Sequence, residues 1–202
     1  MQQLIQNLMA AGSLRTPEII DAWRKIDRAD FVPPNEKANA YENRPLPIGL
    51  GQTISQPQVV ALMLELLQPK KGEKILDVGS GSGWQSALLA EIVGEKGEVT
   101  AIERIPELFA IGKSNLRKYN FRNIESVLGD GTAMIKPNGY YDKIIVAASG
   151  DSIPEALKSE LKVAGTMIIP IEESIFVLTK VGDEHFSKKE FPGFLFVPLM
   201  RD

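Results

Sequence analysis

The stretch Ile75–Trp84 reads ILDVGSGSGW and decides the fold of this 202-residue chain. Its first four residues are mostly apolar and predict a short buried strand, and the glycines that follow predict a tight turn into a helix. Glycine at such a turn lets the backbone approach a ligand closely. The stretch therefore predicts a strand–turn–helix unit of an α/β domain, with a small-molecule site at the turn.

Strand and helix patterns alternate along the rest of the chain. The predicted strands are Lys74–Val78, Glu98–Ile102, Ile124–Leu128, Lys143–Ala147 and Thr166–Ile171, and the predicted helices are Gln85–Val93, Pro106–Tyr119 and Ile153–Leu161. Short apolar strands bounded by helices indicate a parallel sheet covered on both faces. Two more strand-like segments, Ile175–Val181 and Phe194–Leu199, flank a polar stretch, and we expect them to pair as a hairpin at one edge.

The predicted fold class is α/β, a three-layer Rossmann-like fold with a mostly parallel seven-stranded sheet, an antiparallel C-terminal edge and N-terminal helices. Apolar spacing predicts two short helices before residue 31, the second capped by Thr16. Prolines and glycines from Phe31 to Thr53 forbid regular helix and predict an ordered loop, which in a compact domain is usually functional. Ser55 and Gln58 have capping-box spacing at the start of the next helix.

The composition is that of an ordinary globular protein, with 44% hydrophobic and 24% charged residues. We expect one domain, 1–202, in which 1–70 form the N-terminal helices and a substrate and cofactor lid and 71–202 form the sheet core. The net charge of -3 and the lack of a basic stripe exclude nucleic acid as the expected partner. No apolar run reaches the ~20 residues of a membrane span. A cytoplasmic monomer without a membrane partner is therefore expected.

The absence of cysteine excludes disulfides and thiolate chemistry, and no metal site is expected. The single histidine, His185, lies in a polar run and is expected at the surface. The chemistry must therefore rest on other residue types.

Three acidic residues lie at the ends of three predicted strands: Asp77, Glu103 and Asp130. A Rossmann-type site places a ribose-binding acid after its second strand, where Glu103 lies. Each acid also has a simpler structural explanation. Asp77 can cap a tight strand–helix turn, Glu103 can be the acidic residue at the start of a helix, and Asp130 can be part of an ordinary turn. In this order of elements the three acids and the glycine turn form one predicted site.

The glycine turn differs from a dinucleotide fingerprint, because Trp84 stands where the third glycine would be. The pattern D-x-G-x-G-x-G over 77–83 instead resembles motif I of S-adenosylmethionine-dependent methyltransferases. The resemblance implies S-adenosylmethionine as cofactor, with Asp77 near its methionine amino group, directly or through water, Glu103 at the ribose and Asp130 at the adenine amino group.

A longer stretch narrows the family, because Leu46–Pro57 (LPIGLGQTISQP) is similar to the signature of protein-L-isoaspartate O-methyltransferases. The similarity continues through 30–33, 40–42, 102–104, 141–146, 153–157 and 196–199. It implies methylation of the α-carboxyl of L-isoaspartyl residues in aged proteins and peptides, after which the ester collapses to a succinimide. It also implies that the last two strands are swapped relative to other methyltransferases.

The resemblance further implies that Ser55 has the active-site role and that the stretch from Thr53 to Gln58 folds over cofactor and substrate. On sequence alone, Ser55 is equally explained as a helix cap. The residues expected to bind the cofactor are Thr53, Ile54, Ser55, Gln58, Asp77, Gly79, Ser80, Gly81, Gly83, Glu103, Arg104, Asp130 and Gly131.

The expected chemistry needs no general base, since a carboxylate with a reference pKa of ~4 is already ionised at neutral pH. Alignment and exclusion of water are enough for the transfer. Cytosine-C5 methylation needs a cysteine that the chain lacks, and the N-P-P-Y motif of amino-group DNA methylation is absent after Val146.

The sequence departs from the family pattern at Ala147–Gly150, where a threonine followed by small residues is usual, and at Trp84, where tyrosine is more usual. The first departure bears on how the peptide is positioned. Two alternatives therefore stay open: a carboxyl methyltransferase for another peptide or small acid, and a non-catalytic S-adenosylmethionine-binding protein. The intact Gly49–Pro57 stretch argues against the second, because a mere binder has no reason to keep a substrate lid.

Overall fold

The computed structural model describes residues 1–133 and 135–199. A seven-stranded sheet runs through its centre in the order β5-β4-β3-β6-β7-β8-β9. The strands are β3 (Lys74–Val78), β4 (Glu98–Glu103), β5 (Ile124–Leu128), β6 (Tyr141–Val146), β7 (Leu161–Ile171), β8 (Ser174–Lys180) and β9 (Phe186–Pro192). The pairs among β3 to β7 are parallel, and β8 is antiparallel to both of its neighbours. The predicted fold class is confirmed.

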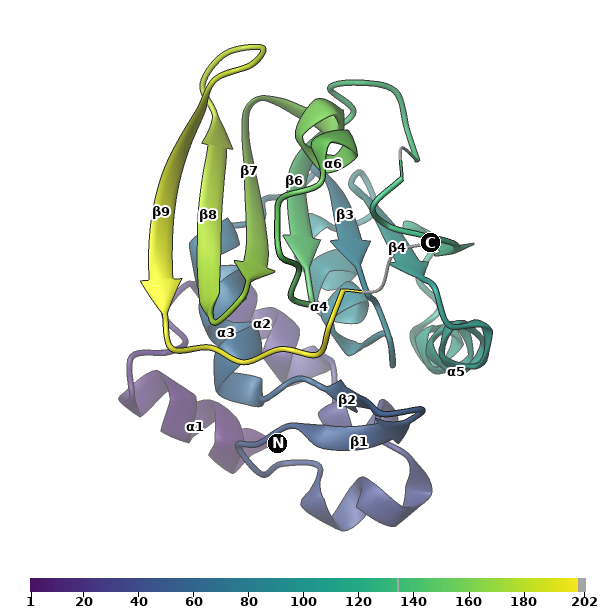
Figure 1. The fold of residues 1–202 in the computed structure, drawn as a ribbon. Helices are drawn as coiled ribbons and strands as arrows, with labels where there is room; N and C mark the ends of the chain where they lie inside the picture. The colour runs from purple at the N-terminus through teal and green to yellow at the C-terminus, as the bar shows by residue number, and fades with distance from the viewer. Residues whose placement is uncertain (134, 200–202) are drawn as a thin grey trace.

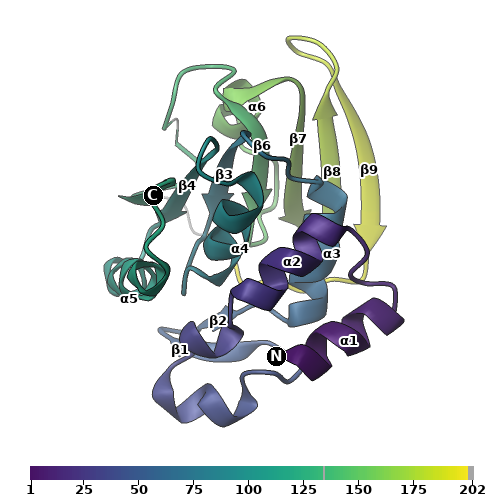
Figure 2. The same ribbon diagram turned by 180° about the vertical axis from the view of Figure 1, so that it is seen from behind.

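Helices cover both faces of this sheet. They are α1 (Gln2–Ala10), α2 (Pro17–Lys25), α3 (Pro57–Leu67), α4 (Trp84–Val93), α5 (Pro106–Leu116) and α6 (Glu155–Glu160). Figure 1 shows α6 in front of the sheet and α2, α3 and α4 behind it, and the view from behind in Figure 2 brings these three to the front. Ile75 and Leu76 of β3 are both fully buried, as expected for a strand with both faces covered.

The stretch expected as an ordered loop contains two short 3-10 helices, η1 (Arg28–Asp30) and η2 (Pro34–Asn39). It continues into a β-hairpin of β1 (Leu46–Gly49) and β2 (Gln52–Ile54), which the sequence analysis did not foresee. In Figure 1 the hairpin lies below the ends to which the arrows of β3 and β6 point. We call residues 40–56 the lid segment.

The predicted C-terminal hairpin is wrong in its second strand. β8 pairs with β9 at Phe186–Pro192, within the stretch expected to be a polar connection. Lys188, Lys189 and Glu190 are exposed there, because β9 is an edge strand with one side open to water. Residues 194–199 instead pass the end of β6, where Pro198 forms an isolated bridge with Ser149.

The predicted capping box at Ser55 is also wrong. Helix α3 begins at Pro57 with Gln56 as its N-cap, and no side chain caps it in the usual way among the described residues. Asn43 of the lid segment takes that place from outside, since its Oδ1 accepts a 3.0 Å hydrogen bond from the N–H of Gln58. Ser55 therefore remains in the extended chain before the helix.

Candidate active site

The main cavity lies where β3, β4 and β6 end, which is where parallel α/β sheets bind ligands. The space between its walls is about 860 Å³, a value that includes the open solvent at its mouth. Its walls are Ile48, Gln52, Thr53, Ile54, Ser55, Val60, Val78, Gly79, Ser80, Gly81, Ser82, Trp84, Gln85, Ile102, Glu103, Arg104, Ile105, Leu108, Gly129, Gly131, Ala147, Ala148, Val197, Pro198 and Leu199. Four residues of the predicted turn thus line this cavity together with residues 48 and 52–55, and they are Gly79, Ser80, Gly81 and Ser82.

The glycine turn is held against β4, because the N–H groups of Gly79 and Ser80 both donate to the carbonyl oxygen of Ile102, at 2.9 and 3.0 Å. Gly81 has φ +49°, and a Cβ there would come within 3.3 Å of the Ile48 side chain. Glycine therefore allows both the backbone conformation and the close approach of the lid.

Gly112 of α5 is a part of the site that the sequence analysis missed. A Cβ at Gly112 would lie 2.4 Å from the carbonyl oxygen of Gly81, so only glycine lets α5 pack directly on the turn. Asn115, three residues later, donates a 3.1 Å hydrogen bond to the Ser82 carbonyl oxygen. The only signal in the sequence was a glycine inside a helical pattern.

Glu103 reaches the cavity wall at the end of β4 and is 7% exposed. Its Oε2 accepts a 2.8 Å hydrogen bond from the N–H of Gly81. Its Oε1 accepts from the N–H groups of Arg104 and Ile105, at 2.8 and 2.9 Å. One carboxylate thus fixes both the glycine turn and the start of α5.

Asp77 is fully buried and lies behind the cavity wall rather than in it. Its two oxygens accept hydrogen bonds from Gln85 Nε2 (2.7 Å) and Ser86 Oγ (2.5 Å) at the start of α4. Burial raises the pKa of Asp77 to about 6, against the lowering effect of the Ser86 and Gln85 hydrogen bonds. Its neighbour Gln85 does line the cavity.

Asp130 also stays out of the cavity wall, although Gly129 and Gly131 on either side line it. Its Oδ1 accepts hydrogen bonds from both the N–H and the hydroxyl of Thr132, each at 2.8 Å. The three predicted acids therefore gather around one end of the sheet, with Glu103 alone exposed to the cavity. Their roles in cofactor binding stay predictions.

The lid segment forms the opposite wall through Thr53, Ile54 and Ser55. Gln58 does not line the cavity, and its side-chain oxygen accepts a 2.9 Å hydrogen bond from Asn43. Gln58 therefore holds the lid segment to α3, and its role in cofactor binding stays a prediction.

A second cavity adjoins the first. It is lined by Pro45, Thr53, Ser55, Gln56, Val59, Ala147, Leu195, Phe196 and Val197, and its volume is about 730 Å³ including open space. Four residues, Thr53, Ser55, Ala147 and Val197, belong to both walls. Ser55 therefore stands at the junction of the two cavities.

The C-terminal segment completes both cavities, a role that the sequence analysis did not give it. The N–H of Ser149 donates to the Val197 carbonyl oxygen (2.8 Å), and the N–H of Leu199 donates to the Ser149 carbonyl oxygen (2.7 Å). The stretch Ala147–Gly150, where the sequence departs from the family pattern, therefore binds the C-terminal segment through the backbone of Ser149. The run of apolar residues at 194–199 was the signal in the sequence, and it was interpreted as an edge strand.

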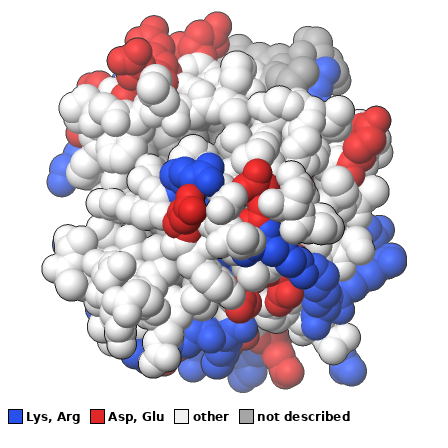
Figure 3. Space-filling view, turned by 90° about the horizontal axis from the view of Figure 1, so that it is seen from below, with Lys and Arg blue, Asp and Glu red and all other residues white. Residues whose placement is uncertain are grey.

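The face on the lid side carries no continuous charged field in Figure 3, where acidic and basic side chains lie interspersed among uncharged ones. Within 1–133 and 135–199, no group of three or more acidic or histidine side chains has metal-site geometry. No helix of the described chain is long and apolar enough to cross a bilayer.

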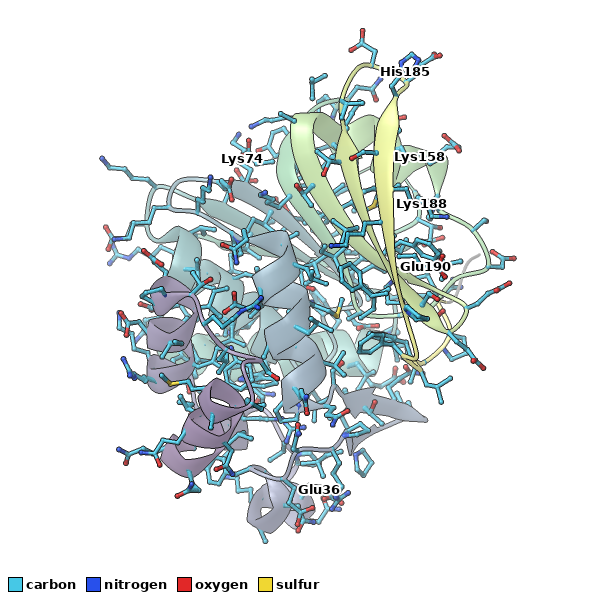
Figure 4. All side chains as sticks on the ribbon, turned by 90° about the vertical axis from the view of Figure 1, so that its left-hand side faces the viewer. Glu36, Lys74, Lys158, His185, Lys188 and Glu190 are labelled. Carbon is cyan, nitrogen blue, oxygen red and sulfur yellow. The ribbon has the colours of Figure 1, made fainter. Side chains whose placement is uncertain are left out.

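His185 is exposed, as expected. In Figure 4 it lies at the tip of the β8–β9 turn, at the opposite end of the molecule from Glu36 in η2. The histidine is therefore far from the lid and both cavities.

Comparison with known proteins shows the family to which this chain belongs. The family model for protein-L-isoaspartate(D-aspartate) O-methyltransferases matches residues 1–202. A protein-L-isoaspartate O-methyltransferase of Ignicoccus hospitalis is 42% identical, over 100% of this chain and 97% of its own length. One from Methanopyrus kandleri is 39% identical, over 98% and 90%.

A solved structure from Plasmodium falciparum is similar over 99% of this chain and 98% of its own, with a TM-score of 0.88 and 26% identity. It is described as a protein-L-isoaspartate O-methyltransferase in complex with S-adenosyl-L-homocysteine. On the full-length family match and these relatives, the chain belongs to the protein-L-isoaspartate (D-aspartate) O-methyltransferase family.

Proposed function

We propose that this chain transfers a methyl group from S-adenosylmethionine to the α-carboxyl of L-isoaspartyl residues in damaged proteins and peptides. The observation that carries the proposal is the junction of two cavities at Ser55. A methyl donor and an acceptor must meet at such a junction, because transfer needs reacting atoms about 3–3.5 Å apart and in line.

The cavity at the glycine turn takes the cofactor, which when bound supplies an electrophilic methyl group on a positively charged sulfur. Glu103 accepts a hydrogen bond from a ribose hydroxyl, since a carboxylate has about four acceptor positions and three are occupied here. Asp77 acts on the methionine amino group through Gln85 or a water, because it lies behind the wall. Asp130 also lies outside the wall, so it acts on the adenine amino group through a water or through the turn of Gly129 and Gly131, which do line the cavity.

The second cavity takes the isoaspartyl group. Its carboxylate is ionised at neutral pH and needs no base, so the protein has only to orient it and exclude water. Thr53 and Ser55 offer hydroxyl groups at the junction, and Ser55 donates to the attacking carboxylate. The apolar side chains of Leu195 and Phe196 line the outer wall, where flanking peptide lies.

A second candidate function is methylation of another peptide or small acid, and the departure at Ala147–Gly150 favours it. Ala147 lines both cavities where the family pattern has a threonine, which removes one hydroxyl from the junction.

We further propose that the chain works as a single-domain cytoplasmic monomer, independent of membranes and nucleic acid. The interspersed charges on the face that Figure 3 shows support the absence of a nucleic-acid partner.

The deciding experiment supplies labelled S-adenosylmethionine with an isoaspartyl peptide and with its normal aspartyl twin. We expect label on the first peptide alone. Transfer to neither peptide, with tight cofactor binding, would leave a binding protein, and equal transfer to both would favour the second candidate function.

The Ser55→Ala variant tests the junction directly. Loss of a hydrogen bond to a charged group costs about 1.5–3 kcal/mol, so kcat/KM should fall roughly 10- to 100-fold. Ser187→Ala is the matched control, since Ser187 lies on the exposed edge strand β9. An undiminished rate for Ser55→Ala would remove Ser55 from its role.

A further inference from the structure

Arg28 in η1 is fully buried, which is unusual for an arginine without an acidic partner. No salt bridge to Arg28 exists within the described chain. The two acids nearest in sequence are engaged elsewhere: Asp27 accepts from Tyr41 and Asp30 from Tyr119. The two terminal nitrogens of the guanidinium must therefore donate to other groups, while its Nε has no acceptor among the described residues.

Those groups are backbone carbonyl oxygens of the lid segment. Nη1 donates to the Ala40 oxygen at 2.7 Å and to the Glu42 oxygen at 3.5 Å, and Nη2 donates to the Arg44 and Ser55 oxygens, both at 3.1 Å. Three of the four acceptors lie in the first five residues of the lid segment, and the fourth, Ser55, lies near its end. One planar side chain thus joins parts of the lid that are up to 15 residues apart, a geometry that a lysine cannot reproduce.

The other side of Arg28 faces the core beside the cofactor cavity. Its guanidinium carbon lies 5.3 Å from the centre of the Trp84 ring, and Trp84 lines that cavity. Trp84 packs edge-to-face on Trp23 of α2, with ring centres 5.0 Å apart. Arg28 therefore connects the lid segment to a rigid part of the core.

The contact with Ser55 gives this arrangement a functional consequence. The Ser55 carbonyl fixes the plane of the peptide that follows it, and so the direction in which the Ser55 side chain leaves the backbone. Ser55 has no capping role in α3 to hold it otherwise. Burial lowers the pKa of Arg28 to about 10, so the group stays charged at neutral pH.

We propose that Arg28 is a positioning residue for methyl transfer: by binding four lid carbonyls it holds Ser55 at the junction of the two cavities. The proposal rests on the proposed function for its effect on transfer. The closure of the lid segment by Arg28 is independent of that function and can be measured without it.

The test compares Arg28→Lys and Arg28→Met with the matched control Asn123→Ala. Asn123 also donates to two backbone carbonyls, those of Ala90 and Gly94 at 3.0 and 2.9 Å, but at the far end of α4. All kinetics are run well below the midpoint of thermal unfolding of each variant. Hydrogen–deuterium exchange of 40–56 is measured in parallel.

For Arg28→Lys, we expect KM for the isoaspartyl peptide to rise about tenfold while the Kd for S-adenosyl-L-homocysteine changes less than about threefold, since Glu103 and the glycine turn are untouched. Arg28→Met should lose about 100-fold in kcat/KM, because a misplacement near 1 Å is enough for such a loss. Both variants should exchange faster at 40–56, whereas Asn123→Ala should not.

Two results would overturn the proposal: unchanged exchange at 40–56 in both Arg28 variants, or kinetic losses that Asn123→Ala reproduces. If the unaltered protein fails to methylate the isoaspartyl peptide, the proposed function fails instead. The exchange measurement then still decides whether Arg28 holds the lid.

Discussion

The carboxylate of Glu103 and the backbone N–H of Gly81 are joined by a 2.8 Å hydrogen bond between the ends of two neighbouring strands. The acid at the end of β4 and the glycine turn after β3 are therefore in register before any ligand enters. A site fixed in this way loses little conformational freedom when it binds.

Replacing Glu103 by glutamine should weaken cofactor binding. The amide NH2 would face either Gly81 or the pair Arg104 and Ile105, so one set of backbone donors loses its acceptor. Hydrogen bonds to charged groups contribute about 1.5–3 kcal/mol, which predicts a Kd for S-adenosyl-L-homocysteine raised roughly 10- to 100-fold by calorimetry. Glu107→Gln, on the exposed first turn of α5, is the control and should bind normally.

The pH dependence of stability should report on Asp77. Its pKa in the folded protein is raised from 3.8 to about 6, so between these values the folded state binds a proton that the unfolded state has lost. The free energy of unfolding should therefore fall as pH rises from about 4 to 6, by roughly 2–3 kcal/mol from this group.

Asp77→Asn keeps the side-chain shape and removes the titration, so its unfolding free energy should lack that fall. Urea denaturation at half-unit pH steps measures the difference. Asp183→Asn, at the exposed turn before His185, should keep the profile of the unaltered protein. Parallel profiles for all three proteins would show that Asp77 does not carry the effect.

Gly112→Ala should disturb the cofactor site from outside it. Alanine is intrinsically better in a helix by about 1 kcal/mol, but its Cβ would meet the Gly81 carbonyl oxygen at 2.4 Å. Either α5 or the glycine turn must shift, and we expect the Kd for S-adenosyl-L-homocysteine to rise at least about tenfold. Ser114→Ala on the exposed face of α5 should leave it unchanged, and equal affinities would mean that the helix yields without moving the turn.

The sequence predicted the site best where the residues that form it also set a clear local structure, as in the glycine turn. The run through Gly79, Gly81 and Gly83 needed only the backbone freedom of glycine to indicate a ligand turn, and parallel order alone brought Glu103 beside it. The residue pattern did not show which of two C-terminal segments pairs with β8. Phe194–Leu199 is an apolar run typical of a strand, yet the charged Phe186–Pro192 pairs with β8, because a short turn brings it back along that strand.

Contacts between distant side chains and backbone were beyond sequence reasoning. Nothing in the sequence around Arg28 indicates that its hydrogen-bond acceptors are backbone carbonyl groups up to 27 residues away. Gly112 carried no sign of its contact with Gly81, and the C-terminal segment no sign that it walls the cavities. These are tertiary relations, fixed by how the lid and α5 pack on the sheet.

Glu65 offers a test of how the N-terminal helices are held. It lies in the apolar pattern of α3 and is 6% exposed, and its Oε1 accepts from the N–H groups of Arg15 and Thr16 at 2.7 and 2.8 Å. Its Oε2 accepts from the Thr16 hydroxyl at 2.8 Å. Burial by itself would raise the pKa of Glu65, but these hydrogen bonds outweigh it and hold the pKa below 4.5.

A carboxylate with a lowered pKa stabilises the fold above its unfolded pKa and loses that contribution as pH falls through the folded value. Glu65→Gln should therefore cost about 1–3 kcal/mol of unfolding free energy at pH 7, because its NH2 group faces backbone donors, and less at pH 3. Glu91→Gln, which breaks only the surface pair with Lys25, should cost under about 1 kcal/mol at both pH values. A Glu65→Gln loss that is no larger than this control, or that does not shrink in acid, would mean that α1 and α2 are held by apolar packing and not by this carboxylate.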